Sequence, residues 1–412
     1  MIIADRFAPH RALWGVLALS LGFKLLLAFT GPVINPDGVL YIAAAREFAA
    51  GNFHAGLDLY PMPAYPLLVA AAHLIFPDWV AAGRAISIAF MVLAVVPLYK
   101  LTERLFDRRA AFWAAVFFAL APEVNENALR VIRDPTFVCL ALTMTYCTVR
   151  CLQDRQLRWC VAGLAAAFAS LLFRIEGIVL VVVPGAFLLV LAATGKNTAL
   201  RSFARRSAAL WIGAPLAIGL MLVLAVGPQL AAQNRIDELV EEAQNLIHSS
   251  AFEKYRQIYA YFKEVQDDPP FSGFSHSLPA TVRHWMPLIY LIGLLESLAK
   301  QLYALFLLPL FFALGKKARE ERQGSIEKRF VLVQVGFYLL FLYYFLVTRD
   351  RMVGRLLLLP ALMLYPWVGY GFGRMLDAMS KTRFAAALRL VVIGLMLVLP
   401  AAESAETAIV SD

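Results

Sequence analysis

The sequence predicts an all-α polytopic membrane protein, because of its composition and the spacing of its apolar runs. Of its 412 residues, 61% are hydrophobic and 16% are charged, and the mean hydropathy is +0.68. Soluble domains are usually about 45–50% apolar. Runs of spanning or near-spanning length predict about eleven transmembrane helices. These runs are 13–30, 79–99, 110–122, 135–149, 159–173, 175–194, 208–230, 285–314, 330–347, 352–373 and 385–402. They leave no room for a separate soluble domain, so residues 1–412 are expected to form one membrane domain.

Positive charge in the short loops predicts the orientation. Lys and Arg gather around 100–109, 150–158, 196–206, 316–329 and 374–389, all on one side of the predicted spans. Such loops usually face the cytoplasm, so the N-terminus is expected inside and the C-terminus outside a bacterial cytoplasmic (inner) membrane. The first run follows Arg6 and Arg11 without a small-x-small cleavage site, so it is expected to be a retained span. The net charge of +9 then reflects topology, and no nucleic-acid partner is predicted.

The four cysteines are predicted to be buried structural residues. They lie within or beside apolar runs and form no CxxC pair, which argues against disulfides or metal ligands. These cysteines are Cys139, Cys147, Cys151 and Cys160.

Two long outer loops are expected, at about 31–78 and 231–284. In the first, Pro32 and Pro36 stop the preceding helix, and Asp37 precedes a weakly amphipathic helix. The proline-rich run 61–76 fits a re-entrant or interfacial segment, or the start of a second helix. The second loop carries aromatic residues at helical spacing over 252–262, which predicts an interfacial helix that either roofs the bundle or contacts substrate. The stretch 271–279 is expected to act as a lid.

Charged residues at the outer ends of the spans predict a cavity there. Charges at membrane depth are costly and usually face a cavity. Each one alone is explained by snorkelling or a structural salt bridge, and Asp37 alone by an N-cap role. Together they suit an anion, because arginine forks donate paired hydrogen bonds to phosphate. No nucleotide-binding or zinc-protease motif competes. The charged residues are Lys24, Arg84, Glu126, Arg133, Asp134, Arg174, Glu176, Arg351 and Arg355.

Six segments resemble, in order, the C-type (GT-C) membrane glycosyltransferases. This group includes bacterial relatives of protein O-mannosyltransferases and lipid A aminoarabinose transferases (glycosyltransferase family 39-like). The segments are NPDGVLYIAAAREFAAGNF, YPMPAYPLLVAA, AGRAISIAFMVLAVVPLYKLTERLFDRRAAFWAA, ALRVIRDPTFVCLAL, LLFRIEGIVLVV and VTRDRMVGRLLLLPALMLYP. The resemblance implies a GT-C-like bundle with amphipathic helices in the first outer loop.

The resemblance also implies a reaction. A sugar would pass from a polyprenyl-phosphate donor to a lipid-linked, glycan or protein acceptor at the periplasmic face, with inversion. Asp37 would be the general base, and cationic groups would stabilise the leaving phosphate. The phosphate-binding candidates are Arg133, Arg174, Arg351 and Arg355, followed by Lys24 and Arg84. The candidates for contacting the sugar or acceptor, or for orienting the arginines, are Tyr41, Glu47, Tyr60, Tyr65, Glu126, Asp134 and Glu176.

The sequence departs from the family pattern in three ways. Gly38 follows Asp37 where many relatives have a second acid, so no metal site is predicted, since a divalent cation needs several oxygen ligands. Met-Val-Gly-Arg replaces the usual Arg-Tyr pair, which leaves Arg351 and Arg355 as alternatives. No extra outer domain is expected, which favours a lipid-linked or small glycan acceptor over a folded protein.

Two other functions stay open at this point. A lipid-linked glycan transporter or flippase would need polar groups that continue to the inner face. A glycan polymerase or ligase that uses a pyrophosphate carrier would need arginines on a large outer loop, whereas the 231–284 loop begins with acidic residues.

Overall fold

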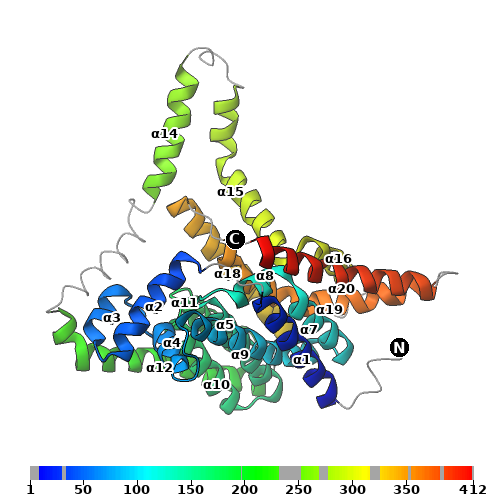
Figure 1. Cartoon of the computed structure of the whole chain (residues 1–412), viewed down its shortest axis with the longest axis horizontal. Helices are drawn as coiled ribbons and strands as arrows, with labels where there is room; N and C mark the ends of the chain where they lie inside the picture. The colour runs from blue at the N-terminus through cyan, green and yellow to red at the C-terminus, as the bar shows by residue number, and fades with distance from the viewer. Residues whose placement is uncertain are drawn as a thin grey trace.

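The computed structural model is a bundle of helices, which confirms the predicted fold class (Figure 1). The model describes residues 9–29, 34–195, 197–231, 252–268, 277–315, 325–350, 354–380 and 385–410, and every regular element among them is an α- or 3-10 helix.

The first half of the chain forms the following helices: α1 (Pro9–Ala28), α2 (Pro36–Ala49), α3 (Phe53–Leu59), α4 (Ala64–His73), α5 (Trp79–Leu93), α6 (Val95–Leu105), α7 (Arg108–Leu120), α8 (Pro122–Leu129), α9 (Asp134–Asp154), α10 (Leu157–Leu171) and α11 (Gly177–Thr194). The second half forms α12 (Thr198–Ala231), α14 (Glu253–Asp267), α15 (Leu278–Leu302), η2 (Ala304–Phe306), α16 (Leu307–Ala313), α18 (Ile326–Arg349), η3 (Gly354–Leu357), α19 (Leu358–Met379) and α20 (Ala385–Val410).

Eight helices in the described ranges are long and apolar enough to cross a membrane, so this is a multi-pass membrane protein. The count of eleven stays a prediction. The predicted runs 110–122 and 159–173 form α7 and α10, which have 13 and 15 residues. The predicted run 285–314 is divided, because α15 ends at Leu302 and Tyr303 has a φ of 68°. A non-glycine residue in this conformation is uncommon and stops the helix.

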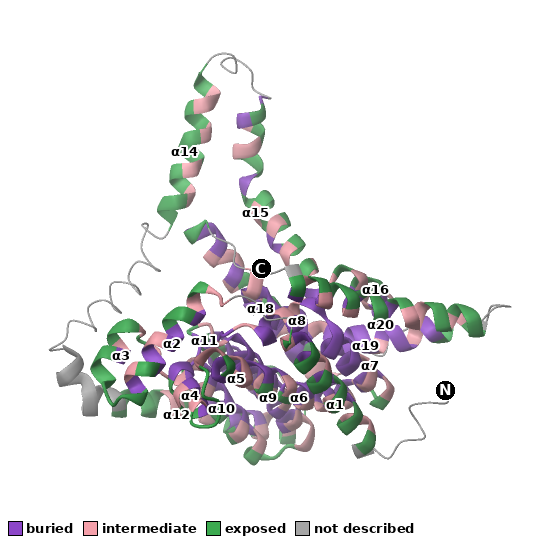
Figure 2. Cartoon of the chain, in the orientation of Figure 1, coloured by how far each residue is buried: buried purple, intermediate pink, exposed green. Residues whose placement is uncertain are grey.

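The core lies around α9 and α19. Figure 2 shows buried residues concentrated in the body of the bundle, and α9 and α19 have the largest buried share of the described spans. The helix α9 packs against α5, α6 and α10, whereas α19 packs against α7, α15 and α16. All four cysteines are buried and free, as their apolar surroundings predicted.

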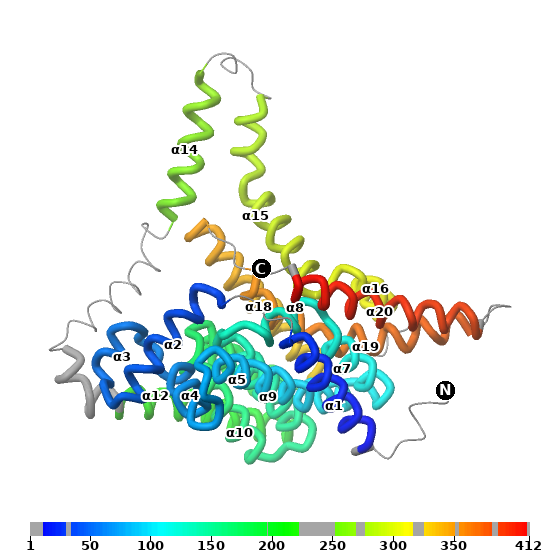
Figure 3. The backbone as a smooth tube through the Cα atoms, viewed as in Figure 1, coloured from blue at the N-terminus to red at the C-terminus, as the bar shows by residue number. Residues whose placement is uncertain are grey.

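The two predicted outer loops contain helices. The first loop forms α2, α3 and α4, and α2 buries one face that includes Tyr41, Ala45 and Phe48. In the second loop, α14 carries the predicted aromatic residues and stands beside the outer half of α15, away from the bundle (Figures 1 and 3). The acidic start of this loop and most of the predicted lid lie outside the described residues.

Candidate active site

Asp37 lies in the first turn of α2 and forms an ion pair with Arg355. The helix begins at Pro36 with Asn35 at the N-cap, so Asp37 is not the N-cap residue. The Asp37 Oδ2 atom is 2.5 Å from Nη1 of Arg355, and both side chains are half-buried. Arg355 belongs to η3, just before α19. An acid in the first helical turn also interacts favourably with the helix dipole.

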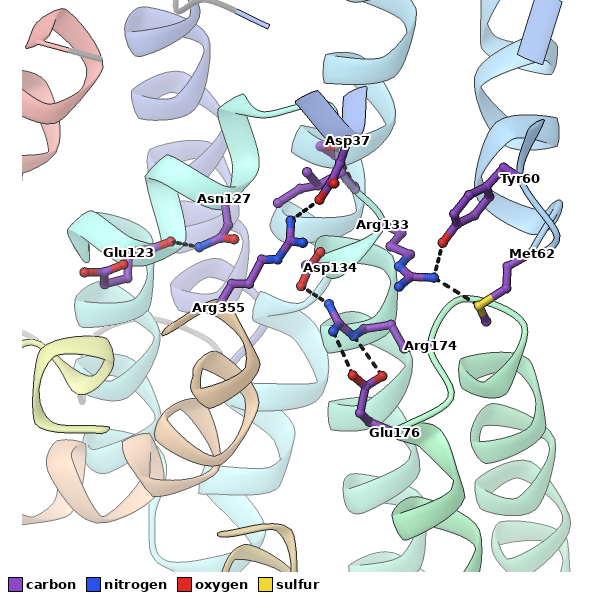
Figure 4. Close-up of polar contacts among 12 residues, drawn as sticks. Asp37, Tyr60, Met62, Glu123, Asn127, Arg133, Asp134, Arg174, Glu176 and Arg355 are labelled. Atoms are coloured by element: carbon purple, nitrogen blue, oxygen red, sulfur yellow. Dashed lines mark hydrogen bonds and ion pairs between the residues drawn. The ribbon is translucent and has the colours of Figure 1, made fainter. Parts of the chain in front are cut away.

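Close packing around Val131 places the neighbouring charges beside Asp37. A Cβ on Gly38 would lie 3.0 Å from Cβ of Val131, and a Cβ on Gly83 would lie 2.5 Å from its Cγ1. Only glycine leaves room for this approach. Val131 is therefore held between α2 and α5, and the segment that follows it brings Arg133 and Asp134 to the same end of the bundle as Asp37 (Figure 4).

Arg174 is buried between two carboxylates. Its Nη1 donates to Asp134 at the start of α9, and its Nη2 and Nε donate to Glu176 at 2.9 and 3.1 Å. Burial alone would lower the pKa of Arg174, but Asp134 and Glu176 raise it above its ordinary value. The guanidinium thus stays charged. Because one cation faces two carboxylates, this triad carries a net negative charge.

Arg133 has a different environment. Its Nη1 donates to the Tyr60 hydroxyl and to Sδ of Met62 at 3.0 Å. Among the described residues no carboxylate forms an ion pair with Arg133. Its described hydrogen bonds thus go to neutral groups, although its charge also helps to lower the pKa of Glu176. An anion can replace these neutral partners without breaking an ion pair.

Arg133 and Asp37 both influence the pKa of the Tyr41 hydroxyl. Burial raises the pKa of Tyr41, the Arg133 guanidinium opposes this rise, and the Asp37 carboxylate adds to it. The Tyr41 ring packs edge-on against Tyr60 and Tyr65, at centroid distances of 4.9 and 5.1 Å. This aromatic group forms a wall between α2 and α4.

Tyr65 borders this charged group through its ring, but its hydroxyl, like the Lys24 ammonium, bonds to other partners. The Tyr65 hydroxyl donates to Gly83 O at 3.2 Å and lies 3.1 Å from Ser87 Oγ. Lys24 is fully buried in α1, where it donates to Ser20 Oγ at 3.1 Å. These contacts are structural.

Three further candidates lie on α5, on the later turns of α2 and on α8. Arg84 is half-buried on α5. Glu47 accepts a hydrogen bond from Asn52 at 3.0 Å, about three turns along α2 from Asp37. Glu126 pairs with Arg130 on α8. Arg351 lies outside the described residues, so of the two late alternatives the structure describes only Arg355.

Sequence reasoning missed Glu123 and Gln301. The Gln301 amide near the end of α15 donates to Glu123 Oε2 at 3.0 Å. Helical spacing between Glu123 and Glu126 was a usable signal, whereas Gln301 stands within an apolar run and gave none. In the described ranges, no group of three or more His, Cys, Asp or Glu side chains is arranged to hold a metal ion.

An apolar groove of about 550 Å³ begins next to the triad. It lies between α11, whose first residue follows Glu176, and α18. Its lining is formed by Ile178, Val179, Val182, Val183, Phe337, Leu340, Phe341 and Tyr344.

Comparisons with known proteins agree with this architecture. Residues 60–225 match the family model described as dolichyl-phosphate-mannose-protein mannosyltransferase. A search of curated protein sequences found no match.

Two solved structures illustrate the structural similarity. The oligosaccharyltransferase of Archaeoglobus fulgidus, in complex with zinc and sulfate, matches with a TM-score of 0.60 and 15% identity over 97% of this chain. ArnT from Cupriavidus metallidurans bound to undecaprenyl phosphate matches with a TM-score of 0.50 and 14% identity over 95% of this chain. The chain spans 53% of the archaeal protein and 74% of ArnT.

At these identities the structural matches establish the fold, and the family match adds a resemblance within residues 60–225. The protein thus has the fold of the C-type membrane glycosyltransferases, the group that its sequence motifs resemble.

Proposed function

We propose that the protein transfers a sugar from a polyprenyl-phosphate donor to an acceptor at the membrane surface, with inversion of the anomeric carbon. The observation that carries this proposal is the Asp37–Arg355 pair, which lies at the same end of the bundle as Arg133 (Figure 4). A carboxylate base and a cationic phosphate site are the two groups that a single displacement at a sugar phosphate requires.

Asp37 acts as the general base in this proposal. It accepts the proton of the acceptor hydroxyl as that oxygen attacks the anomeric carbon. The Nη1 atom of Arg355 lies 2.5 Å from Oδ2 of Asp37. A donor phosphate would compete for the Arg355 guanidinium, because phosphate accepts paired hydrogen bonds from an arginine fork. Donor binding would therefore free Asp37 for the acceptor hydroxyl.

Arg133 binds the leaving phosphate. Its partners are a tyrosine hydroxyl and a thioether, which a phosphate can replace without breaking an ion pair. Arg174 instead acts as a positioning residue, because Asp134 and Glu176 already occupy its guanidinium. The triad holds the start of α9 against the turn before α11 and so fixes the position of Arg133, which precedes Asp134.

The groove between α11 and α18 receives the start of the polyprenyl chain. It is wholly apolar and opens one turn beyond Glu176. The printed descriptions of two structural neighbours name undecaprenyl phosphate and a dolichol-phosphate as their ligands, and a ligand of this kind has a charged head and an apolar tail. In this protein the head would lie near Arg133 and Arg355 and the tail in the groove.

Sugar release from synthetic polyprenyl-phosphate donors tests this function. Purified full-length protein in liposomes is incubated with a panel of polyprenyl-phosphate hexoses and pentoses, and the release of polyprenyl monophosphate is measured. Asp37→Asn should lower the rate about 10²–10⁴-fold, the usual contribution of a general base. Asp58→Asn, at an exposed acid on α3, is the matched control and should keep the wild-type rate.

Three results would contradict the proposal. These are wild-type activity in Asp37→Asn, retention of the anomeric configuration, and turnover of pyrophosphate-linked donors only. The last result would favour a polymerase or ligase instead.

A further inference from the structure

A second polar cluster lies between α8 and the end of α15. Glu123 and Glu126 are three residues apart on α8, and Glu126 pairs with Arg130. The Gln301 Nε2 atom donates to Glu123 Oε2 at 3.0 Å. On the next position of the same helix, the Asn127 Nδ2 atom donates to the Glu123 carbonyl at 2.7 Å. The polar side chains of Glu126, Asn127 and Gln301 thus lie next to Glu123.

Two acceptor atoms in this cluster lack a donor. The Gln301 side chain belongs to a residue that is only 8% exposed, and its Oε1 has no hydrogen-bond partner. Asn127 is 2% exposed, and its Oδ1 has none either. Both amides already use their nitrogen atoms for Glu123. A buried acceptor without a donor is destabilising, so a ligand that brings donors to these atoms would be stabilised here.

The cluster borders the Asp37–Arg355 pair. The Gln301 Nε2 atom lies 3.3 Å from the position of a Cβ on Gly354, the residue before Arg355. In Figure 4, Asn127 lies between Glu123 and Arg355, and Arg133 lies on the other side of Asp37.

We propose that Glu123, Glu126, Asn127 and Gln301 form a subsite that binds the hydroxyl groups of a sugar acceptor. This proposal rests on the proposed glycosyl transfer and identifies the acceptor as a glycan. Glu123 and the two amide carbonyls accept hydrogen bonds from sugar hydroxyls, and the bound sugar then presents one hydroxyl to Asp37.

The charge of the cluster separates the acceptor from the donor phosphate. Glu123 and the two amide carbonyls present acceptors that disfavour phosphate, whereas Glu126 is neutralised by its ion pair with Arg130. Burial, followed by the Glu126 carboxylate, raises the pKa of Glu123 to about 7. Because this pKa is near neutral, the Glu123 carboxyl group can offer both a donor and acceptors to a polyhydroxylated ligand. In a displacement, the attacking hydroxyl and the leaving phosphate must lie on opposite sides of the anomeric carbon. In Figure 4, Glu123 and Arg133 lie on opposite sides of Asp37.

The test measures sugar binding directly. Purified full-length protein is titrated with the methyl glycosides of glucose, mannose, galactose and arabinose, and binding is followed by saturation-transfer NMR. At least one glycoside should bind the wild type. Gln301→Met keeps the side-chain shape and should weaken that binding about tenfold, the value of one or two hydrogen bonds. Glu123→Gln provides a second variant and should weaken binding as well.

Gln334→Met is the matched control. Gln334 is a buried glutamine on α18, in the interior of the bundle. Its Nε2 atom donates a hydrogen bond to Oγ1 of Thr145. This variant should bind the glycosides like the wild type. Asp37→Asn should also keep sugar binding while it loses transfer, which separates the subsite from the catalytic proposal. The subsite is refuted if no glycoside binds, if both Gln301→Met and Glu123→Gln bind normally, or if Gln334→Met weakens binding equally.

Discussion

At one end of α9, Asp134 pairs with Arg174, and at the other end Asp154 pairs with Arg104 and Arg150. The first pair is buried, with side-chain exposures of 4% and 6%. The pairs of Asp154 have distances of 2.9 and 3.0 Å, and their side chains are 23–34% exposed. A helix of this length extends about 30 Å, so the two groups lie at opposite ends of the bundle.

The difference in burial gives the two ends different energetics. Partly exposed ion pairs are screened by water and contribute about 0–1 kcal/mol. Buried charges must lose their hydration, so a buried pair is costly to form and more costly to break. At the Asp154 end, the ion pairs therefore join α6 and α9 with a small desolvation penalty. At the Asp134 end, the buried ion pair carries a large desolvation penalty. Retention of such a pair is typical of functional sites in membrane proteins.

The two ends also differ in how their arginines are balanced. At the Asp154 end, Arg104 and Arg109 each pair with an acid, Asp154 and Asp377. At the Asp134 end, Arg133 contacts only Tyr60 and Met62 among its described partners. Because Arg133 donates its described hydrogen bonds to neutral groups, it can exchange these partners for a phosphate.

Substitution of the central arginine at each end should show the largest contrast. Arg174→Gln leaves Asp134 and Glu176 buried without their cation and should lower the free energy of unfolding by about 3–5 kcal/mol. Arg104→Gln should lower it by about 1 kcal/mol or less. Denaturant unfolding in detergent measures both. Equal losses would contradict the difference in burial on which the comparison depends.

A smaller effect is expected for Arg133→Gln, and it should concern the substrate. Loss of a charge-assisted hydrogen bond to the donor phosphate costs about 1.5–3 kcal/mol, so the donor KM should rise about 10- to 150-fold. The unfolding free energy should change little, because no ion pair of the described residues is lost. Arg109→Gln at the opposite end is the control and should keep the donor KM. An unchanged KM in Arg133→Gln would remove this residue from phosphate binding.

The smallest effect should come from the titration of Glu123, which water partly screens. Burial and Glu126 raise its pKa from 4.5 to about 7, so the folded protein holds this proton more tightly than the unfolded chain does. The stabilisation is complete below pH 4.5 and is lost as the pH rises to about 7. Glu123→Gln should therefore gain stability relative to the wild type between pH 5 and pH 8, as unfolding midpoints at these two values would show. A constant difference would mean that the pKa of Glu123 is not raised.

The sequence was informative where a local pattern suffices. Apolar runs of spanning length predicted the fold class, and the amphipathic residues after Asp37 predicted a helix there. That helix begins earlier than expected, at Pro36, so Asp37 lies in its first turn. The motifs also predicted the resemblance to C-type glycosyltransferases. The run 285–314 was predicted as one span, because hydropathy does not register the positive φ at Tyr303 that divides it.

The amino-acid sequence by itself determined the membrane architecture and the candidate charges, because the cost of placing apolar or charged groups in a bilayer depends on each segment alone. Only the tertiary structure decided how those charges are used. It joined Arg355 to Asp37, enclosed Arg174 between Asp134 and Glu176, and left Arg133 with neutral partners. It also brought Gln301 to Glu123. These pairings join segments far apart in the chain, and they depend on how helices pack, which no local periodicity contains.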